Sequence, residues 1–221
     1  MTAKTGLANK SNMKIPMEGT LLFFGDSITD SARDPANPAS LGVGYVNQIA
    51  SRIGYKYPSP ARRVINAGVG GNRIYDLERR LESDLIAHQP SLVTILVGIN
   101  DTWRQFDSNR VSSIADFRAA YERILVSTTT RIAPCPRLIL MEPFVLPDPE
   151  DRRTWRTDLD SRIAVVRDLA VQFNARLIPL DGLFSAAATR APASYWLHDG
   201  VHPTPAGHAL IAEAWLSNMN F

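Results

Sequence analysis

Two short segments near opposite ends of the chain carry the residue types of a nucleophilic catalytic centre. Ser27 follows an apolar run at 20–25, where a strand-to-helix turn can expose its hydroxyl while nearby amides point toward developing negative charge. Asp199 and His202 are three residues apart, so the carboxylate can bind one imidazole nitrogen while the other faces a nucleophile. These residues can act as nucleophile, orienting acid and base. The alternatives are a helix cap at Ser27 and a surface loop pair at Asp199 and His202.

Residues that follow two other apolar runs could donate hydrogen bonds to an oxyanion. Gly71, with Gly70 beside it, lets the backbone approach a substrate and present an amide, or else forms a turn that needs positive φ. Asn100 could offer its side-chain amide to the same charge, or else form an Asx turn or cap a helix.

Polar and aromatic neighbours of these segments are candidates for substrate binding. The ring of Trp103 can stack on a sugar face and the guanidinium of Arg104 can bond hydroxyl groups, although Trp103 could also pack on its own loop. We expect Asp26 to contribute to the substrate site, or, together with Asp30, to bond the turn amides around Ser27.

A metal site is the alternative chemistry for the C-terminal histidines. His198 and His208 flank the Asp199 and His202 pair, and both residue types are common metal ligands. The spacing matches no strong zinc pattern and no cysteine lies nearby, so we expect no metal and no organic cofactor.

The elements that must position these residues alternate regularly along the chain. Five apolar runs predict strands covered on both faces, at 20–25, 63–68, 91–98, 137–143 and 175–181. Helical periodicity lies between them, and Thr204 and Pro205 mark the start of a last helix. This alternation predicts a three-layer α/β/α sandwich around a five-stranded parallel sheet. Ligands bind beyond the carboxyl ends of such strands, which is where the polar segments fall.

Length and charge set the remaining expectations. The 221 residues suit one domain at 18–221 behind a flexible segment at 1–17. A formal net charge of +2 argues against a nucleic-acid partner, and no segment approaches the roughly 20 apolar residues of a membrane span. Without a signal-peptide core in this sequence, we expect a cytoplasmic location. Trp215, Leu216 and Phe221 could serve either the core or the interface of a homo-oligomer.

Taken in order, the polar segments resemble the four conserved blocks of the GDSL/SGNH hydrolase family over residues 20–217. The matching residues are Gly25-Asp26-Ser27, Gly71, Gly98-x-Asn100-Asp101 and Asp199-x-x-His202. Gly71 is chosen over Gly70 because residues 66–72 resemble the family's Asn-x-x-x-x-Gly-Asp/Asn stretch. The resemblance implies a flavodoxin-like topology. It also implies an acyl-enzyme on Ser27, with His202 as base, Asp199 as its partner and an oxyanion hole formed by Ser27, Gly71 and Asn100.

Finer similarities narrow the implied substrate. The segments at 25–30, 41–45 and 98–107 look like those of the family's acetylxylan esterases, which implies deacetylation of small-molecule or oligosaccharide esters. A lysophospholipase or thioesterase is the alternative within the family. A flavin- or nucleotide-binding protein is the alternative from another class, but residues 25–31 lack a glycine-spaced phosphate loop. A non-catalytic carbohydrate-binding module would not require the Asp199 and His202 pair.

Overall fold

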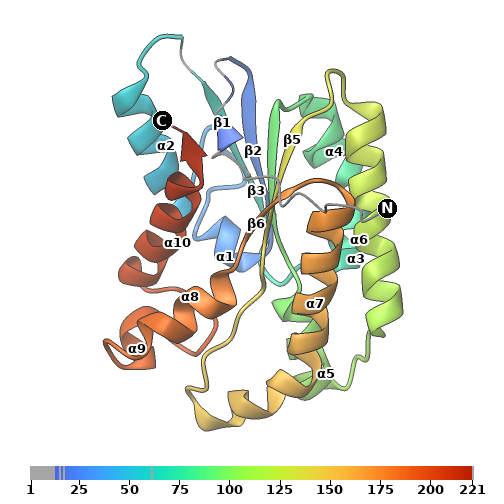
Figure 1. Cartoon of the computed structure of the whole chain (residues 1–221), viewed down its shortest axis with the longest axis vertical. Coiled ribbons are helices and arrows are strands. Elements are labelled where there is room, and N and C mark those ends of the chain that lie inside the picture. The colour runs from blue at the N-terminus through green and yellow to red at the C-terminus, as the bar shows by residue number, and fades with distance from the viewer. Residues whose placement is uncertain (1–12, 15, 17, 61, 221) are drawn as a thin grey trace, which may run out of the picture.

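Every apolar run predicted to be a strand forms one, and together they make a five-stranded parallel sheet (Figure 1). The computed structural model describes residues 13, 14, 16, 18–60 and 62–220. The strands, in chain order, are β2 (Thr20–Gly25), β3 (Arg63–Gly68), β4 (Leu92–Leu96), β5 (Arg137–Met141) and β6 (Arg176–Ile178). They lie side by side in the order β3-β2-β4-β5-β6, which is the flavodoxin-like order. The predicted fold class is therefore confirmed.

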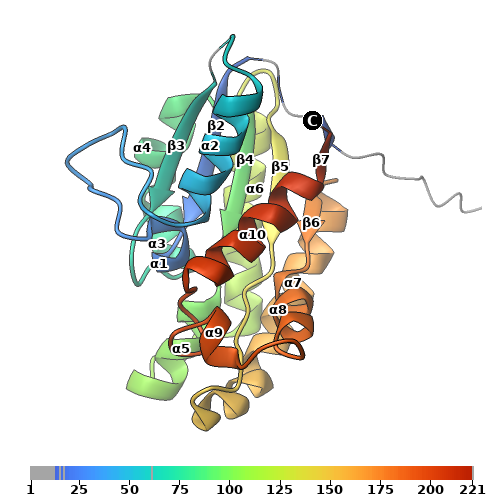
Figure 2. The ribbon, with the colours of Figure 1, turned by 90° about the vertical axis from the view of Figure 1, so that its left-hand side faces the viewer.

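Alternation along the strands builds two separate cores. Leu21 and Phe23 of β2 pack into one cluster, while Leu22 and Phe24 pack into the other, because successive strand residues point to opposite faces. The first face is covered by α2 (Tyr45–Lys56), α8 (Leu180–Ala187), α9 (Ala193–Trp196) and α10 (Pro205–Ser217), which lie in front of the sheet in Figure 2. The second face is covered by α3 (Ile74–Arg79), α4 (Leu81–Asp84) and α6 (Ile114–Arg131), and α7 (Arg156–Gln172) contributes to both clusters.

The strand order reverses between β2 and β4. The connection from β2 runs through α2 on one face, whereas the connections that enter and leave β4 run over the other face. Two helices begin at the carboxyl ends of these neighbouring strands: α1 (Ser27–Asp30) after β2 and α5 (Ile99–Ser108) after β4. In open α/β sheets, ligands bind at such a reversal, beyond the carboxyl ends of the strands, so a site is expected between the two helix starts.

Two local features differ from the sequence pattern. The periodicity of Ile74, Leu77, Leu81 and Leu85 suggests one helix, but the helix breaks at Arg80 and continues as α4 and the short helix η1 (Ile86–His88). The helices α2, α5, α8 and α9 carry no sequence prediction. The last helix is confirmed, since Pro205 is its first residue and the hydroxyl of Thr204 accepts the Gly207 amide at 3.2 Å.

The chain ends meet in a second, very small sheet. Met13 and Lys14 form β1, which pairs in parallel with β7 (Met219–Asn220). Pro16 is also described. Residues 1–12, 15 and 17 of the N-terminal segment expected to be flexible lie outside the described residues, and so does Phe221. Leu216 and Trp215 belong to the core. Within the described ranges, no helix combines the length and the apolar character needed to cross a membrane.

Trp215 offers a test of how the last helix is held on the sheet. Its side chain is fully buried and its indole Nε1 donates to the Thr94 hydroxyl on β4 at 3.0 Å. We expect Trp215→Phe to lower the free energy of unfolding by about 2 kcal/mol, because the smaller ring leaves a cavity and an unpaired hydroxyl. Urea unfolding measures this, with Val171→Ala as an exposed control. A loss of unfolding free energy equal to that of the control would show that Trp215 does not hold the last helix on the sheet.

Candidate active site

Ser27, His202 and Asp199 form one hydrogen-bonded chain beyond the carboxyl end of β2. The Ser27 Oγ lies 3.0 Å from His202 Nε2, and His202 Nδ1 lies 2.8 Å from Asp199 Oδ2. The serine and the histidine are 175 residues apart, so only the fold brings them together. The other oxygen of Asp199 accepts the backbone amides of Val201 and His202 at 3.0 and 2.8 Å. The three predicted residues therefore meet in the arrangement that nucleophilic catalysis requires.

The Asp199 carboxylate fixes the tautomer of the imidazole. Partial burial pushes the pKa of Asp199 upward, but the hydrogen bonds from the amide and ring of His202 and from the Val201 amide outweigh it, so this pKa lies below its usual value. An ionised carboxylate only accepts hydrogen bonds, so the hydrogen of neutral His202 lies on Nδ1. The lone pair on Nε2 then faces the Ser27 hydroxyl, as a general base requires.

A glycine with positive φ shapes the loop that carries Asp199 and His202. Gly200 has φ of +82°, and a Cβ there would lie 2.5 and 2.6 Å from the carbonyl oxygens of Asp148 and Leu146. The Gly200 carbonyl also accepts the Leu146 amide at 2.9 Å. Only glycine fits this conformation and this contact, so the loop is clamped against the segment that follows β5.

Ser27 is held at the start of α1 by buried polar contacts. Asp26 caps the helix by accepting the Ile28 amide at 3.0 Å, and Asn66 on β3 donates to the carbonyls of Thr29 and Leu41 at 2.7 and 2.9 Å. Asp26 is fully buried, and burial, opposed by the bond from Ile28, raises its pKa to about 7. These contacts fit the structural alternative for Asp26, and its predicted contact with a substrate stays a prediction.

The candidate oxyanion donors lie on a turn and a helix start next to Ser27. The turn from Val69 to Asn72 closes by a 3.3 Å bond, and its third residue, Gly71, has φ of +77°, which that position requires. A Cβ on Gly70 would lie 4.0 Å from the Cβ of Ser27. Asn100 is in the first turn of α5, whose cap is Gly98, and its Nδ2 donates to the Asn72 carbonyl at 3.1 Å. The second amide hydrogen of Asn100 is left for another acceptor.

An aromatic wall stands beside His202. The ring of Trp103 lies 5.7 Å from the His202 ring and 5.1 Å from that of Trp155, measured between centroids. The guanidinium of Arg152 lies 5.0 Å from the first indole and 4.2 Å from the second. Arg104, the other predicted pocket residue, pairs with Asp107 on its own helix. Sequence reasoning missed Arg152 and Trp155 on η2 (Glu150–Trp155), and only the preceding proline-rich loop at 143–149 hinted at this region.

His208 takes part in a second serine–histidine pair. Its Nδ1 accepts the Tyr45 amide at 3.2 Å, and its Nε2 lies 3.2 Å from the Ser31 hydroxyl. Burial, with smaller effects of His198 and His202, lowers its pKa to about 4. The ring is therefore neutral with its hydrogen on Nε2, so it donates to Ser31 and cannot act as its base. Among the described residues, no group of three or more His, Cys, Asp or Glu side chains is placed to hold a metal ion.

Comparison with known proteins finds a matching hydrolase family and similar esterases. The sequence matches the GDSL-like lipase/acylhydrolase family over residues 23–210. It is 35% identical over 216 residues to an acetylxylan esterase of Geobacillus stearothermophilus, covering 95% of this chain and 97% of that protein. The crystal structure of Axe2, an acetylxylan esterase from that organism, matches with a TM-score of 0.81, 30% identity and coverage of 94% and 96%. Catalytic mutants of Axe2 with a serine, a histidine or an aspartate replaced by alanine match similarly. LAE5, an α/β hydrolase enzyme from the metagenome of Lake Arreo, Spain, matches with a TM-score of 0.82, 28% identity and coverage of 90% and 94%.

Two of the positive-φ glycines, Gly71 and Gly200, allow the loop clamp to be tested. No atom lies within 4 Å of the position that a Cβ would take on Gly71, whereas a Cβ on Gly200 meets two backbone carbonyls. We expect Gly71→Ala to cost about 1 kcal/mol of unfolding free energy from its φ alone, and Gly200→Ala to cost more than about 2 kcal/mol. Urea titration of both variants measures the difference. Equal losses would show that the contact with Asp148 and Leu146 does not constrain the loop.

The depressed pKa of His208 predicts a pH-dependent stability. The unfolded histidine takes up a proton below its ordinary pKa of 6.5, whereas the folded one resists protonation down to about 4. The folded state therefore loses stability as the pH falls from 7 to 5, by roughly 1–2 kcal/mol from this group. We expect the stability of the wild type minus that of His208→Asn to fall by that amount in denaturant titrations. Asp26 is present in both proteins, so its effect cancels. A pH-independent difference would contradict the neutral, buried ring.

Proposed function

The chain belongs to the GDSL-like lipase/acylhydrolase family and is a carboxylic ester hydrolase, and we propose that it removes O-acetyl groups from carbohydrates through an acyl-enzyme on Ser27. The observation that carries the proposal is the chain of hydrogen bonds from Ser27 through His202 to Asp199, with distances of 3.0 and 2.8 Å. The catalytic mutants of Axe2 at a serine, a histidine and an aspartate support the same choice of residue types.

The first half of the reaction acylates the serine. Nε2 of His202 takes the proton of the Ser27 hydroxyl as Oγ attacks the acetyl carbonyl carbon, and Asp199 stabilises the imidazolium that forms. The tetrahedral intermediate then collapses. The bond between the carbonyl carbon and the sugar oxygen breaks, and His202 gives its proton to that oxygen. The deacetylated alcohol leaves, and the acetyl group remains on Ser27.

The second half returns the enzyme to its starting state. His202 takes a proton from water as the water oxygen attacks the acetyl carbon, and it then gives that proton to the Ser27 oxygen as the bond between this oxygen and the acetyl carbon breaks. Acetic acid leaves and loses its remaining proton to water, which gives acetate. No redox step occurs and no co-reactant other than water is required.

The negative charge of both tetrahedral intermediates would be bound by three donors: the Ser27 amide, the Gly71 amide and the side chain of Asn100. The turn that contains Gly71 lies next to Ser27, and Asn100 is oriented by its bond to the Asn72 carbonyl. Removal of one such donor typically lowers turnover about 100- to 1000-fold.

Carbohydrate esters fit the surroundings of His202. Trp103 is partly exposed beside the imidazole, and an indole in this position offers a flat surface on which a sugar ring can stack. The similarity to acetylxylan esterases supports acetyl as the acyl group.

Hydrolysis of p-nitrophenyl acetate, butyrate and octanoate, together with acetate release from acetylated xylo-oligosaccharides, tests the proposal. We expect the acetyl ester to be preferred, acetate to be released, and Ser27→Ala to lose at least about 1000-fold in kcat. Ser31→Ala is the matched control. It removes a serine hydroxyl that also faces a histidine, but one whose histidine donates instead of accepting, so its activity is retained.

Two results would reject parts of the proposal. Preference for the octanoyl ester would indicate a lipase or thioesterase substrate instead. Full activity of Ser27→Ala would exclude the serine mechanism.

A further inference from the structure

One guanidinium joins the backbone segments that meet at the proposed oxyanion hole. Arg80, at the break between α3 and α4, donates from Nη2 to the Gly25 carbonyl and from Nη1 to the Ala67 carbonyl, both at 2.8 Å. Its Nε donates to the side-chain oxygen of Asn72 at 2.7 Å. The side chain is only 14% exposed, so these contacts are shielded from water.

Two of these acceptors, on Gly25 and Asn72, lead directly to proposed catalytic groups. Gly25 is the last residue of β2, two positions before Ser27, and its carbonyl also accepts the Val69 amide at 3.1 Å. Asn72 ends the turn that contains Gly71, and its backbone carbonyl accepts the side-chain amide of Asn100. The serine, the glycine turn and the asparagine are therefore all within one or two bonded steps of the Arg80 side chain.

The geometry of Arg80 is fixed on its remaining sides. Its Nη1 also pairs with Asp84 at 2.9 Å, and its guanidinium lies 4.5 Å from the centre of the Phe24 ring. A planar fork with several donors at set angles can hold two carbonyls and an amide oxygen at once. A lysine ammonium reaches these separate acceptors less well, because its donors all sit on one nitrogen.

We propose that Arg80 is a positioning residue for the oxyanion hole. It fixes the carboxyl end of β2, which leads into Ser27, against the turn that contains Gly71. Through Asn72 it also sets the position of Asn100. This role rests on the proposed function. Because the oxyanion forms only during the reaction, a loosened oxyanion hole stabilises the transition state less and leaves substrate binding nearly unchanged.

The steady-state kinetics of Arg80→Lys with p-nitrophenyl acetate test this role. We expect kcat to fall at least about tenfold while KM changes less than about twofold, because small misplacements at a reacting centre are costly. Asn72→Ala cuts only the link to the glycine turn and should lower kcat by a smaller factor. The double variant should be no slower than Arg80→Lys, because both changes disturb the same contacts.

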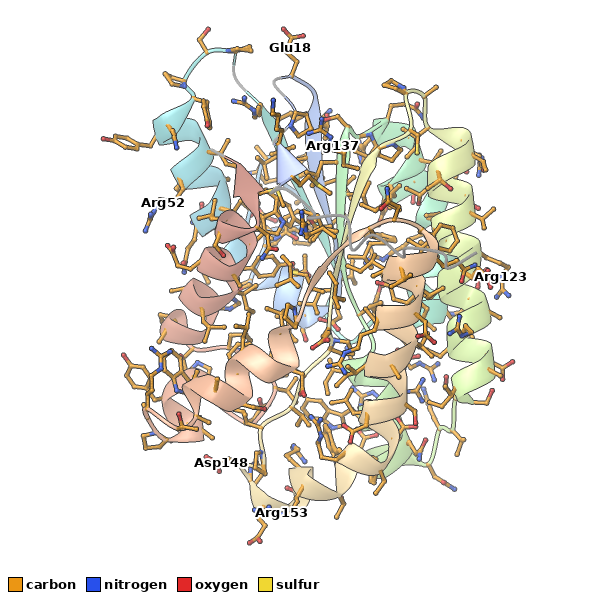
Figure 3. All side chains as sticks on the ribbon, in the orientation of Figure 1. Glu18, Arg52, Arg123, Arg137, Asp148 and Arg153 are labelled. Carbon is orange, nitrogen blue, oxygen red and sulfur yellow. The ribbon has the colours of Figure 1, made fainter. Side chains whose placement is uncertain are left out.

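Arg123→Lys is the matched control. Arg123 projects from the outer side of α6 (Figure 3) and its guanidinium binds both carboxylate oxygens of Glu78, so the same substitution removes a similar fork that contacts none of the proposed catalytic residues. We expect its kcat to equal that of the wild type. Thermal unfolding of each variant shows that it is folded at the assay temperature.

The outcomes separate this proposal from the serine mechanism. A folded Arg80→Lys with wild-type kcat, or with a change confined to KM, overturns the role of Arg80. If that variant does not fold, Asn72→Ala decides, and a wild-type kcat there overturns the role. Ser27→Ala is measured in parallel. If it is inactive while Arg80→Lys is fully active, only the role of Arg80 fails, whereas an active Ser27→Ala rejects the mechanism on which the proposal rests.

Discussion

The reversal of strand order between β2 and β4 decides where this fold can carry out chemistry. Because the connections of these neighbouring strands pass over opposite faces, the helices α1 and α5 both start at their carboxyl ends, where open α/β sheets bind ligands. Ser27 and Asn100 stand in the first turns of those helices. The loop before α10 brings Asp199 and His202 to the same region. Residues 175 positions apart therefore meet at this reversal.

Buried polar contacts make this region rigid. Asp101, next to Asn100, accepts the Ile74 amide at 3.1 Å, and burial, opposed chiefly by Arg162, raises its pKa to about 7. The hydroxyl of Thr102 donates to Asp158 at 2.7 Å, and Asp158 in turn accepts from Nε of the fully buried Arg162 at 2.8 Å. These bonds tie the start of α5 to α3 and α7. Burying such polar groups costs free energy, but their bonds hold the neighbouring hydrogen-bond donors of the site in fixed positions, as preorganised catalysis requires.

Much of this arrangement can be predicted from the sequence because it depends on local patterns. Apolar runs identify all five strands, and Thr204 with Pro205 identifies the last helix, since strand burial and helix capping are local. Ser27, Asp199 and His202 stand out by residue type and position. Contacts between distant segments leave no such pattern. Arg80 lies where a helical periodicity is interrupted, and its contacts with the carbonyls of Gly25 and Ala67 join distant segments. The contribution of Arg152 and Trp155 is visible only in the structure, where they pack with Trp103 beside His202. The residue type of Asp26 suits a site residue, and its capping role is visible only in its complete burial and its bond to the Ile28 amide.

If Ser27 carries the acyl group during turnover, the acetylated enzyme can be trapped. The wild-type enzyme is mixed with p-nitrophenyl acetate, quenched with acid within milliseconds and analysed by intact-protein and peptide mass spectrometry. We expect one acetyl group to be added per chain, to map to the peptide containing Ser27, and to be absent from the Ser27→Ala protein. Acetylation mapped to another residue would contradict an acyl-enzyme on Ser27. So would a burst of product during which no acetylated enzyme is detected.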